Sequence, residues 1–109
     1  MDTYLYRFSF VPPNSLFPGM GAFHGSELAY VFSNPWTATP FADAEKALSL
    51  SMIGYWGRFA DSSDPNGDDA ILWPKYLTDT DLHLILDTEI STGTGLNKDK
   101  CDFWSAFGM

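Results

Sequence analysis

The sequence predicts an α/β architecture, in which strands and helices form packed layers. Residues 4–11 read YLYRFSFV, a run of aromatic and β-branched residues that is typical of a strand. Residues 42–60 carry apolar residues three and four positions apart, which predicts a long helix with one buried face. Residues 82–87, LHLILD, predict a second strand. Two strands are too few for a complete layered domain, so we expect a part of one.

The first predicted strand leads into a loop and then a short helix. Its aromatic residues on one face are Tyr4, Tyr6, Phe8 and Phe10. Pro12 and Pro13 end the strand, and residues 12–21 contain three prolines and two glycines, a composition typical of a loop. We expect Ser26 to cap a short helix that stops at the breaker Asn34-Pro35.

The helix at residues 42–60 is the best-defined element of the pattern. Its apolar stripe consists of Ala44, Leu48, Met52, Tyr55 and Phe59. Ile53, Trp56 and Ala60 widen this stripe, so we expect the helix to have apolar neighbours on more than one side.

The last third of the chain contains a turn, an apolar segment and a final helix. Residues 61–69, DSSDPNGDD, form an acidic turn that stops the long helix. Residues 71–76, ILWPKY, are apolar but interrupted by Pro74, which predicts a buried loop or an edge segment. Asn97 opens the predicted final helix. We expect that helix to bury Cys101, Trp104 and Phe107.

Charge and composition exclude several classes of function. Fourteen acidic and six basic side chains give a formal charge of −8, which opposes binding to nucleic acid phosphates or anionic lipid headgroups. Cys101 is the single cysteine, so no disulfide can close within the 109 residues and no thiolate cluster can hold a metal. Residues 1–13 match neither a signal peptide nor a membrane span. We expect no metal, no cofactor and no membrane insertion.

One of the two histidines has the setting of a catalytic residue. His24 lies between Gly21 and Gly25, and glycine adopts backbone angles that let a loop turn sharply and present a side chain. The imidazole has an unperturbed pKa near neutrality, as a general base requires. A position after a strand and before a helix is where α/β-hydrolases keep the histidine of a serine triad.

Four segments, in order, resemble the type-B carboxylesterase and cholinesterase family. GAFHGSELAYVF is similar to the family's histidine motif, Gly-x-x-His-Gly-x-Glu, and AEKALSLSMIGYWGRFADSSDPNG is similar to its helix with Trp-x-x-Phe-Ala and an Asx-Pro-Asn turn. LWPKY matches a Trp-Pro-x-Tyr segment, and CDFWSAF is similar to the family's last helix. The resemblance implies that residues 1–109 are the C-terminal segment of a carboxylesterase type-B domain, with the last strands and helices of an α/β-hydrolase fold.

The resemblance also implies roles for single residues. His24 corresponds to the triad histidine, which takes a proton from a serine hydroxyl and later returns it. Glu27 matches the glutamate of the same motif, where a first-turn acid favoured by the helix dipole and a supporting role beside the site remain alternatives. Cys101 matches a cysteine that pairs with an upstream cysteine in cholinesterases. His83 has no counterpart in the family motifs, and we expect it to be structural.

A nucleophile is missing from the printed sequence. No serine satisfies Gly-x-Ser-x-Gly, so we expect the 109 residues alone to be inactive as a serine esterase. The implied partners are the remaining N-terminal part of a hydrolase domain and, in the parent protein, a small ester. The family resemblance suggests a secreted parent.

Two other functions remain as alternatives. One is a non-catalytic adhesion or binding module of the same fold, which would have no need for the imidazole of His24. The other is a binding module that folds alone. The excess of aromatic residues argues against this last alternative, because an incomplete sheet leaves large rings facing water.

Overall fold

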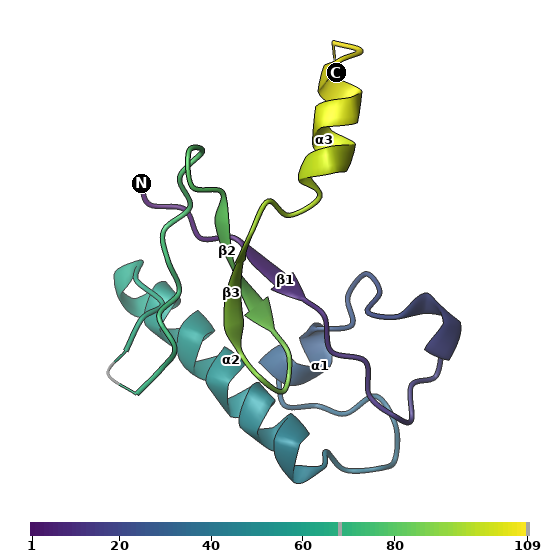
Figure 1. The fold of residues 1–109 in the computed structure, drawn as a ribbon. Helices are drawn as coiled ribbons and strands as arrows, with labels where there is room; N and C mark the ends of the chain where they lie inside the picture. The colour runs from purple at the N-terminus through teal and green to yellow at the C-terminus, as the bar shows by residue number, and fades with distance from the viewer. Residues whose placement is uncertain (68, 109) are drawn as a thin grey trace.

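A computed structural model describes residues 1–67 and 69–108. The elements in chain order are β1 (Tyr6–Phe8), a short 3-10 helix (Pro18–Met20), α1 (Leu28–Val31), α2 (Asp43–Ser62), β2 (Leu82–Leu86), β3 (Ser91–Thr94) and α3 (Lys98–Ser105). Figure 1 shows α2 running beneath a small sheet, with α1 beside it and α3 extending away from both. The predicted α/β architecture is confirmed.

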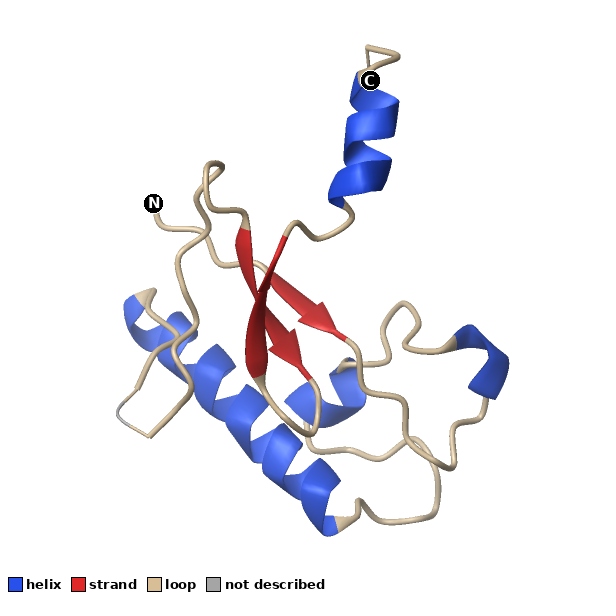
Figure 2. Ribbon diagram, in the orientation of Figure 1, coloured by secondary structure: helices blue, strands red, loops and turns tan. Residues whose placement is uncertain are grey.

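The sheet has three strands in the order β1, β2, β3 (Figure 2). β1 pairs with β2 in parallel, with Tyr6 opposite Leu84 and Phe8 opposite Leu86. β2 pairs with β3 in antiparallel orientation, with His83 opposite Gly93. Both predicted strands are confirmed, in shorter form.

β3 was not predicted from the sequence. Its residues, STGT, lack an alternation of apolar and polar side chains, and all but Gly93 are exposed. A tight reversal after β2 returns the chain alongside that strand, so backbone pairing rather than side-chain burial forms β3.

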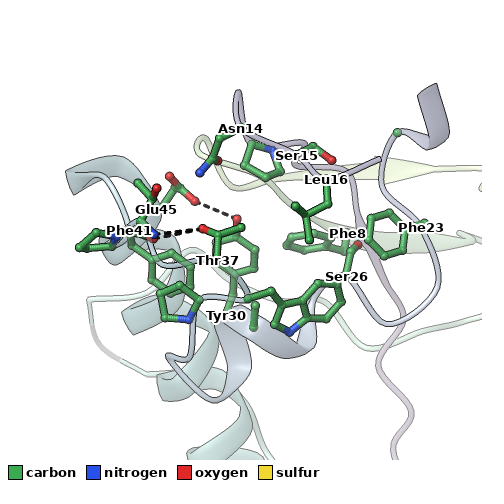
Figure 3. Close-up of a pocket in the computed structure, with 17 residues that line it drawn as sticks. Phe8, Asn14, Ser15, Leu16, Phe23, Ser26, Tyr30, Thr37, Phe41 and Glu45 are labelled. Carbon is green, nitrogen blue, oxygen red and sulfur yellow. Dashed lines mark hydrogen bonds between the residues drawn. The ribbon is translucent and has the colours of Figure 1, made fainter. Parts of the chain in front are cut away.

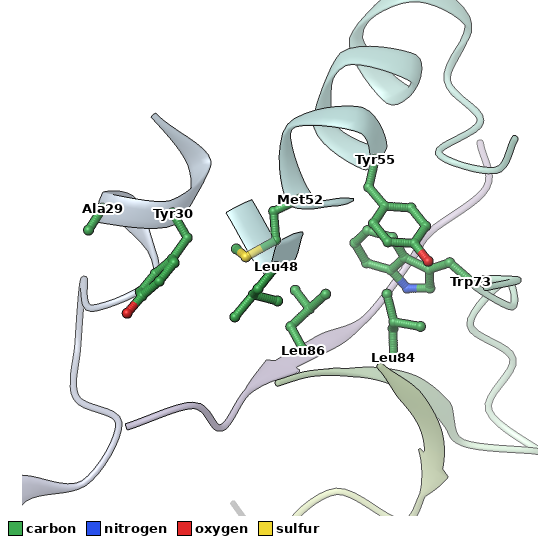
Figure 4. Close-up of a cluster of buried hydrophobic side chains, with 8 residues drawn as sticks. All are labelled: Ala29, Tyr30, Leu48, Met52, Tyr55, Trp73, Leu84 and Leu86. Atoms are coloured by element: carbon green, nitrogen blue, oxygen red, sulfur yellow. The ribbon is translucent and has the colours of Figure 1, made fainter. Parts of the chain in front are cut away.

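One face of the sheet packs on α2 and forms the core. The buried apolar residues are Ala29, Tyr30, Leu48, Met52, Tyr55, Trp73, Leu84 and Leu86. Leu86 projects from β2 toward Leu48 and Met52 of α2, and Leu84 projects toward Tyr55 and Trp73 (Figure 4). The predicted aromatic face of β1 packs against the same core, with all four rings partly buried.

Residues 71–76 form a loop as predicted, but burial is confirmed only at Trp73, which is 6% exposed, since Ile71 and Leu72 are 53% and 66% exposed. The indole Nε1 donates to the Leu5 carbonyl oxygen at 3.0 Å, tying the loop to the first strand segment. The side chain of Asn66 holds the same loop from the other side. Its Oδ1 accepts from the Trp73 backbone N–H at 2.6 Å, and its Nδ2 donates to the Trp73 carbonyl at 3.0 Å.

The expectation that the final helix buries its apolar residues is wrong. α3 has no buried residue, Cys101 is exposed, and Trp104 and Phe107 are 54% and 68% exposed. The helix forms where predicted, but it stands apart from the core (Figure 1). The rings of Phe103, Trp104 and Phe107 contact one another instead.

Candidate functional site around His24

His24 begins a turn that leads directly into α1, and its side chain is exposed. Gly21 and Gly25 on either side have φ of +61° and +83°, which side chains with a Cβ rarely adopt. The predicted reason for these glycines is therefore correct: they turn the backbone on both sides of the histidine. The imidazole of His24 makes no hydrogen bond to any described residue, so its ring nitrogens are available to another group.

Aromatic packing and backbone hydrogen bonds fix the loop that carries His24. The Phe23 ring contacts Phe17 edge-on, with 5.6 Å between centroids, and lies 5.7 Å from Trp36. The Ser26 N–H donates to the Phe23 carbonyl at 2.9 Å, closing a turn around His24. Phe23 therefore anchors the loop on its inner side while His24 faces outward.

The His24 loop follows the carboxyl end of β1, a strand in parallel pairing. In open α/β sheets, ligands bind outside the carboxyl ends of the parallel strands. The loop therefore follows a strand end of the kind at which open α/β sheets bind their ligands.

Glu27 is half-buried and faces β1. The hydroxyl of Tyr6 donates to its Oε1 at 3.4 Å, which is a long and weak hydrogen bond. Burial raises the pKa of Tyr6, and the Glu27 carboxylate raises it further. The carboxylate thus contacts β1 from the His24 loop, and Glu27 precedes α1, whose first turn contains no acidic residue.

The prediction that Ser26 caps α1 is wrong. The helix begins after Glu27, and no side chain caps it. The Ser26 Oγ is instead enclosed without a hydrogen-bond partner among the described residues. α1 has four residues, and the preceding turn at His24, rather than a side-chain cap, determines where the helix begins.

An apolar hollow lies behind the His24 loop (Figure 3). Its lining combines Phe23 and Ser26 of the loop with rings from β1, α1 and the segment before α2, including Phe8, Tyr30, Trp36 and Phe41. The sequence analysis did not single out this hollow. The high aromatic content of the sequence was the one signal for this hollow, and composition does not show which rings pack together.

Tyr30 holds the hollow together. Its ring stacks on Phe41 with 4.8 Å between centroids, and its hydroxyl donates to Glu45 Oε2 at 2.9 Å. Burial and the hydrogen bond to Glu45 raise the pKa of Tyr30 well above its ordinary range. These contacts join α1 to the start of α2 behind the histidine.

The second histidine lies elsewhere in the fold. His83 is 4% exposed, on β2, and no hydrogen bond joins it to His24 or Glu27 among the described residues. The expectation of a structural residue fits its burial.

Neither a metal centre nor a membrane span is visible in the described part of the chain. No group of three His, Cys, Asp or Glu side chains in residues 1–67 and 69–108 could hold a metal ion. None of the helices within those residues is long and apolar enough to cross a bilayer.

The model of the Carboxylesterase family matches residues 1–104. The chain belongs to the carboxylesterase family. It is 37% identical to carboxylesterase 4A of Bos taurus over 103 residues, covering 93% of this chain and 18% of that protein. Acetylcholinesterase 1 of Caenorhabditis elegans is 31% identical over 120 residues, and the match covers 97% of this chain and 19% of that protein.

Solved structures of carboxylesterase relatives show the same arrangement. A PNB esterase superimposes with a TM-score of 0.79 at 31% identity, covering 93% of this chain and 21% of the esterase. A thermophylic PNB esterase gives a TM-score of 0.78 at 29% identity. The chain thus has part of the α/β-hydrolase fold and spans about a fifth of the length of these relatives.

Proposed function

We propose that this chain supplies the histidine general base of a serine carboxylic-ester hydrolase. The observation that carries the proposal is the setting of His24. An exposed imidazole without a partner lies between two glycines of positive φ, within a segment that belongs to the carboxylesterase family. An imidazole in this setting is available to take the proton of a serine hydroxyl and to return it to the leaving alcohol.

In this proposal, the nucleophile and the oxyanion-binding groups lie in the polypeptide that completes the domain together with this segment. That partner polypeptide is the remaining N-terminal part of a hydrolase domain, and the substrate of the assembled enzyme is a small ester. Glu27 supports the site through its contact with Tyr6. Residues 1–109 alone are inactive, because a general base without a nucleophile cannot form an acyl-enzyme.

A direct assay tests the inactivity. Purified residues 1–109 are incubated with short acyl esters, with and without a serine-directed phosphonate. We expect no turnover that the phosphonate blocks. Phosphonate-sensitive hydrolysis would show that a serine of this chain is a nucleophile and would contradict the proposal.

A chimera tests the role of His24. The matching fifth of a PNB esterase is replaced by residues 1–109, and ester hydrolysis is compared with that of His24→Ala and Lys46→Gln variants. Loss of the base lowers kcat by at least about three orders of magnitude, because triad residues act as a unit. The exposed Lys46 on α2 is the control, and its variant keeps full activity.

Two outcomes would favour other functions. An active chimera in which His24→Ala has no effect would remove the imidazole from the mechanism. A genomic reading frame without Gly-x-Ser-x-Gly upstream of Met1 would favour the non-catalytic adhesion or binding module.

A further inference from the structure

His83 carries an unexplained polar atom. The residue is 4% exposed, and its Nδ1 is enclosed without a hydrogen-bond partner among the described residues. Buried polar atoms are nearly always paired, because an unpaired one loses its hydrogen bonds to water without replacement. The two ring nitrogens of His83 therefore have different surroundings, since only Nδ1 is enclosed.

The ring of His83 lies across Gly93 of β3. A Cβ at position 93 would approach the ring atoms Cε1 and Nε2 to 3.0 Å, which is closer than most such contacts. Glycine at this position thus leaves room for the imidazole on the sheet face opposite the core, since the neighbouring Leu84 points into the core.

The chemical form of the imidazole follows from this geometry. A neutral imidazole has one N–H donor and one acceptor nitrogen. An enclosed N–H without an acceptor is the rarer and costlier defect, so we assign the proton to Nε2 and leave the lone pair on the enclosed Nδ1. His83 therefore offers a donor at Nε2, on the Gly93 side of the ring.

Arg7 contributes positive charge to a second hollow, which His83 and Gly93 also line and which is separate from the aromatic hollow behind the His24 loop. Arg7 lies on β1 opposite Ile85, so both side chains share the face of His83. Arg7 is exposed, and its guanidinium makes no ion pair or hydrogen bond with the described residues. Arg7, His83, Ile85, Gly93, Thr94 and Asn97 all line this hollow.

We propose that this hollow binds a carboxylate, the side chain of an Asp or Glu on a polypeptide segment that crosses this sheet face. A carboxylate accepts from Nε2–H of His83 and from the guanidinium of Arg7, and such charge-assisted hydrogen bonds are the strong ones. Charge complementarity selects an anion, because the guanidinium of Arg7 forms no ion pair with the described residues.

The uncovered face of the sheet indicates which polypeptide supplies the carboxylate. All-parallel sheets are found almost exclusively with both faces covered, and in this mixed sheet β1 and β2 form a parallel pair while α2 covers one face. The chain spans about a fifth of its relatives, whose further polypeptide is the natural cover. The inference rests on the proposed function, because the segment that covers this face belongs to the remaining hydrolase domain.

Carboxylate binding to residues 1–109 tests the proposal without any esterase assay. Acetate and a blocked aspartate (N-acetyl-aspartate methylamide) are titrated while the His83 ring nitrogens and the Arg7 Nε are followed by NMR; neutral acetamide is the matched probe. We expect saturable shifts with both carboxylates and none with acetamide. Arg7→Gln weakens binding at least about fivefold, whereas Lys46→Gln, which removes the same charge on α2, leaves it unchanged.

Several results would overturn the proposal. Equal binding of acetamide, or equal affinity of Arg7→Gln and wild type, would exclude a carboxylate site. Binding of acetate without the blocked aspartate would exclude a polypeptide source. A second readout needs no spectral assignment: sodium acetate must raise the thermal midpoint of the wild type more than that of Arg7→Gln, because a ligand of the folded state stabilises it, whereas exclusion of the salt from the surface acts on both alike. Equal rises contradict the proposal, and none of these results bears on the role of His24.

Discussion

The two longer helices, α2 and α3, follow similar sequence patterns but end in different environments. α2 buries Leu48, Met52 and Tyr55 against the sheet. α3 buries nothing, although Cys101 and Trp104 lie three positions apart as on a buried face. Periodicity therefore indicates which side of a helix is apolar, while burial depends on a second surface within reach.

The largest effect is expected at the centre of the α2 contact. Met52 is 0% exposed, so Met52→Ala removes buried methylenes and leaves a cavity that costs about 3 kcal/mol of unfolding free energy. Urea unfolding measures this loss. The control is Leu50→Ala on the same helix, where 70% exposure predicts a change below about 0.5 kcal/mol. Similar losses for both variants would mean that α2 does not present this face to the sheet.

A smaller loss is expected where the loop after α2 is held against the core. Asn66→Ala removes both side-chain hydrogen bonds to the Trp73 backbone, at a cost of about 2 kcal/mol. Urea unfolding gives the loss, and tryptophan fluorescence reports whether Trp73 becomes exposed. Asn34→Ala at an exposed position is the control. An unchanged stability would show that Trp73 is held by packing alone.

Alkaline pH tests the α1 to α2 contact through Tyr30. Its pKa is raised above the ordinary value of 10.0 by burial and by Glu45, so the unfolded state releases its proton first. Stability is therefore full below pH 10.0 and falls as pH rises above that value. Thermal midpoints measured across this range check the fall. Tyr30→Phe is expected to lessen the dependence without abolishing it, because burial also raises the pKa of Tyr6 and Tyr55. A profile identical to wild type would contradict the assignment.

The smallest effect is expected in α3. Trp104→Ala changes the unfolding free energy by less than about 0.5 kcal/mol, because more than half of the side chain is already exposed, at 54%. The measurement is again urea unfolding of residues 1–109. A loss above about 1.5 kcal/mol, in the range of a buried ring, would show that α3 packs against the core in solution.

The fold was predictable where a local pattern coincided with burial. The apolar spacing along α2 gave that helix within two residues at its end, and the apolar run of β2 gave that strand to within one residue. β3 could not be predicted, because its Ser, Thr and Gly residues carry no burial pattern and pair only through backbone. The failure of Ser26 as a cap has a similar cause, since the turn at His24 already sets the start of α1.

The candidate site was predictable in part. Glycines of positive φ on both sides of an exposed His24 were expected from the residue types alone. The aromatic hollow behind the loop was not, because Phe8, Tyr30 and Phe41 come from separate segments. The special position of His83 was also missed, since its strand pattern resembles that of any buried residue.

The sequence by itself determined the family, the helix and strand types and the histidine held between two glycines. These properties depend on neighbouring residues and on motifs of fixed spacing. Only the tertiary structure decided that Trp73 is buried while Trp104 is exposed, and that His83 lies over Gly93 beside Arg7. The physical reason is that burial and pairing are properties of two surfaces, and the second surface is remote in the chain.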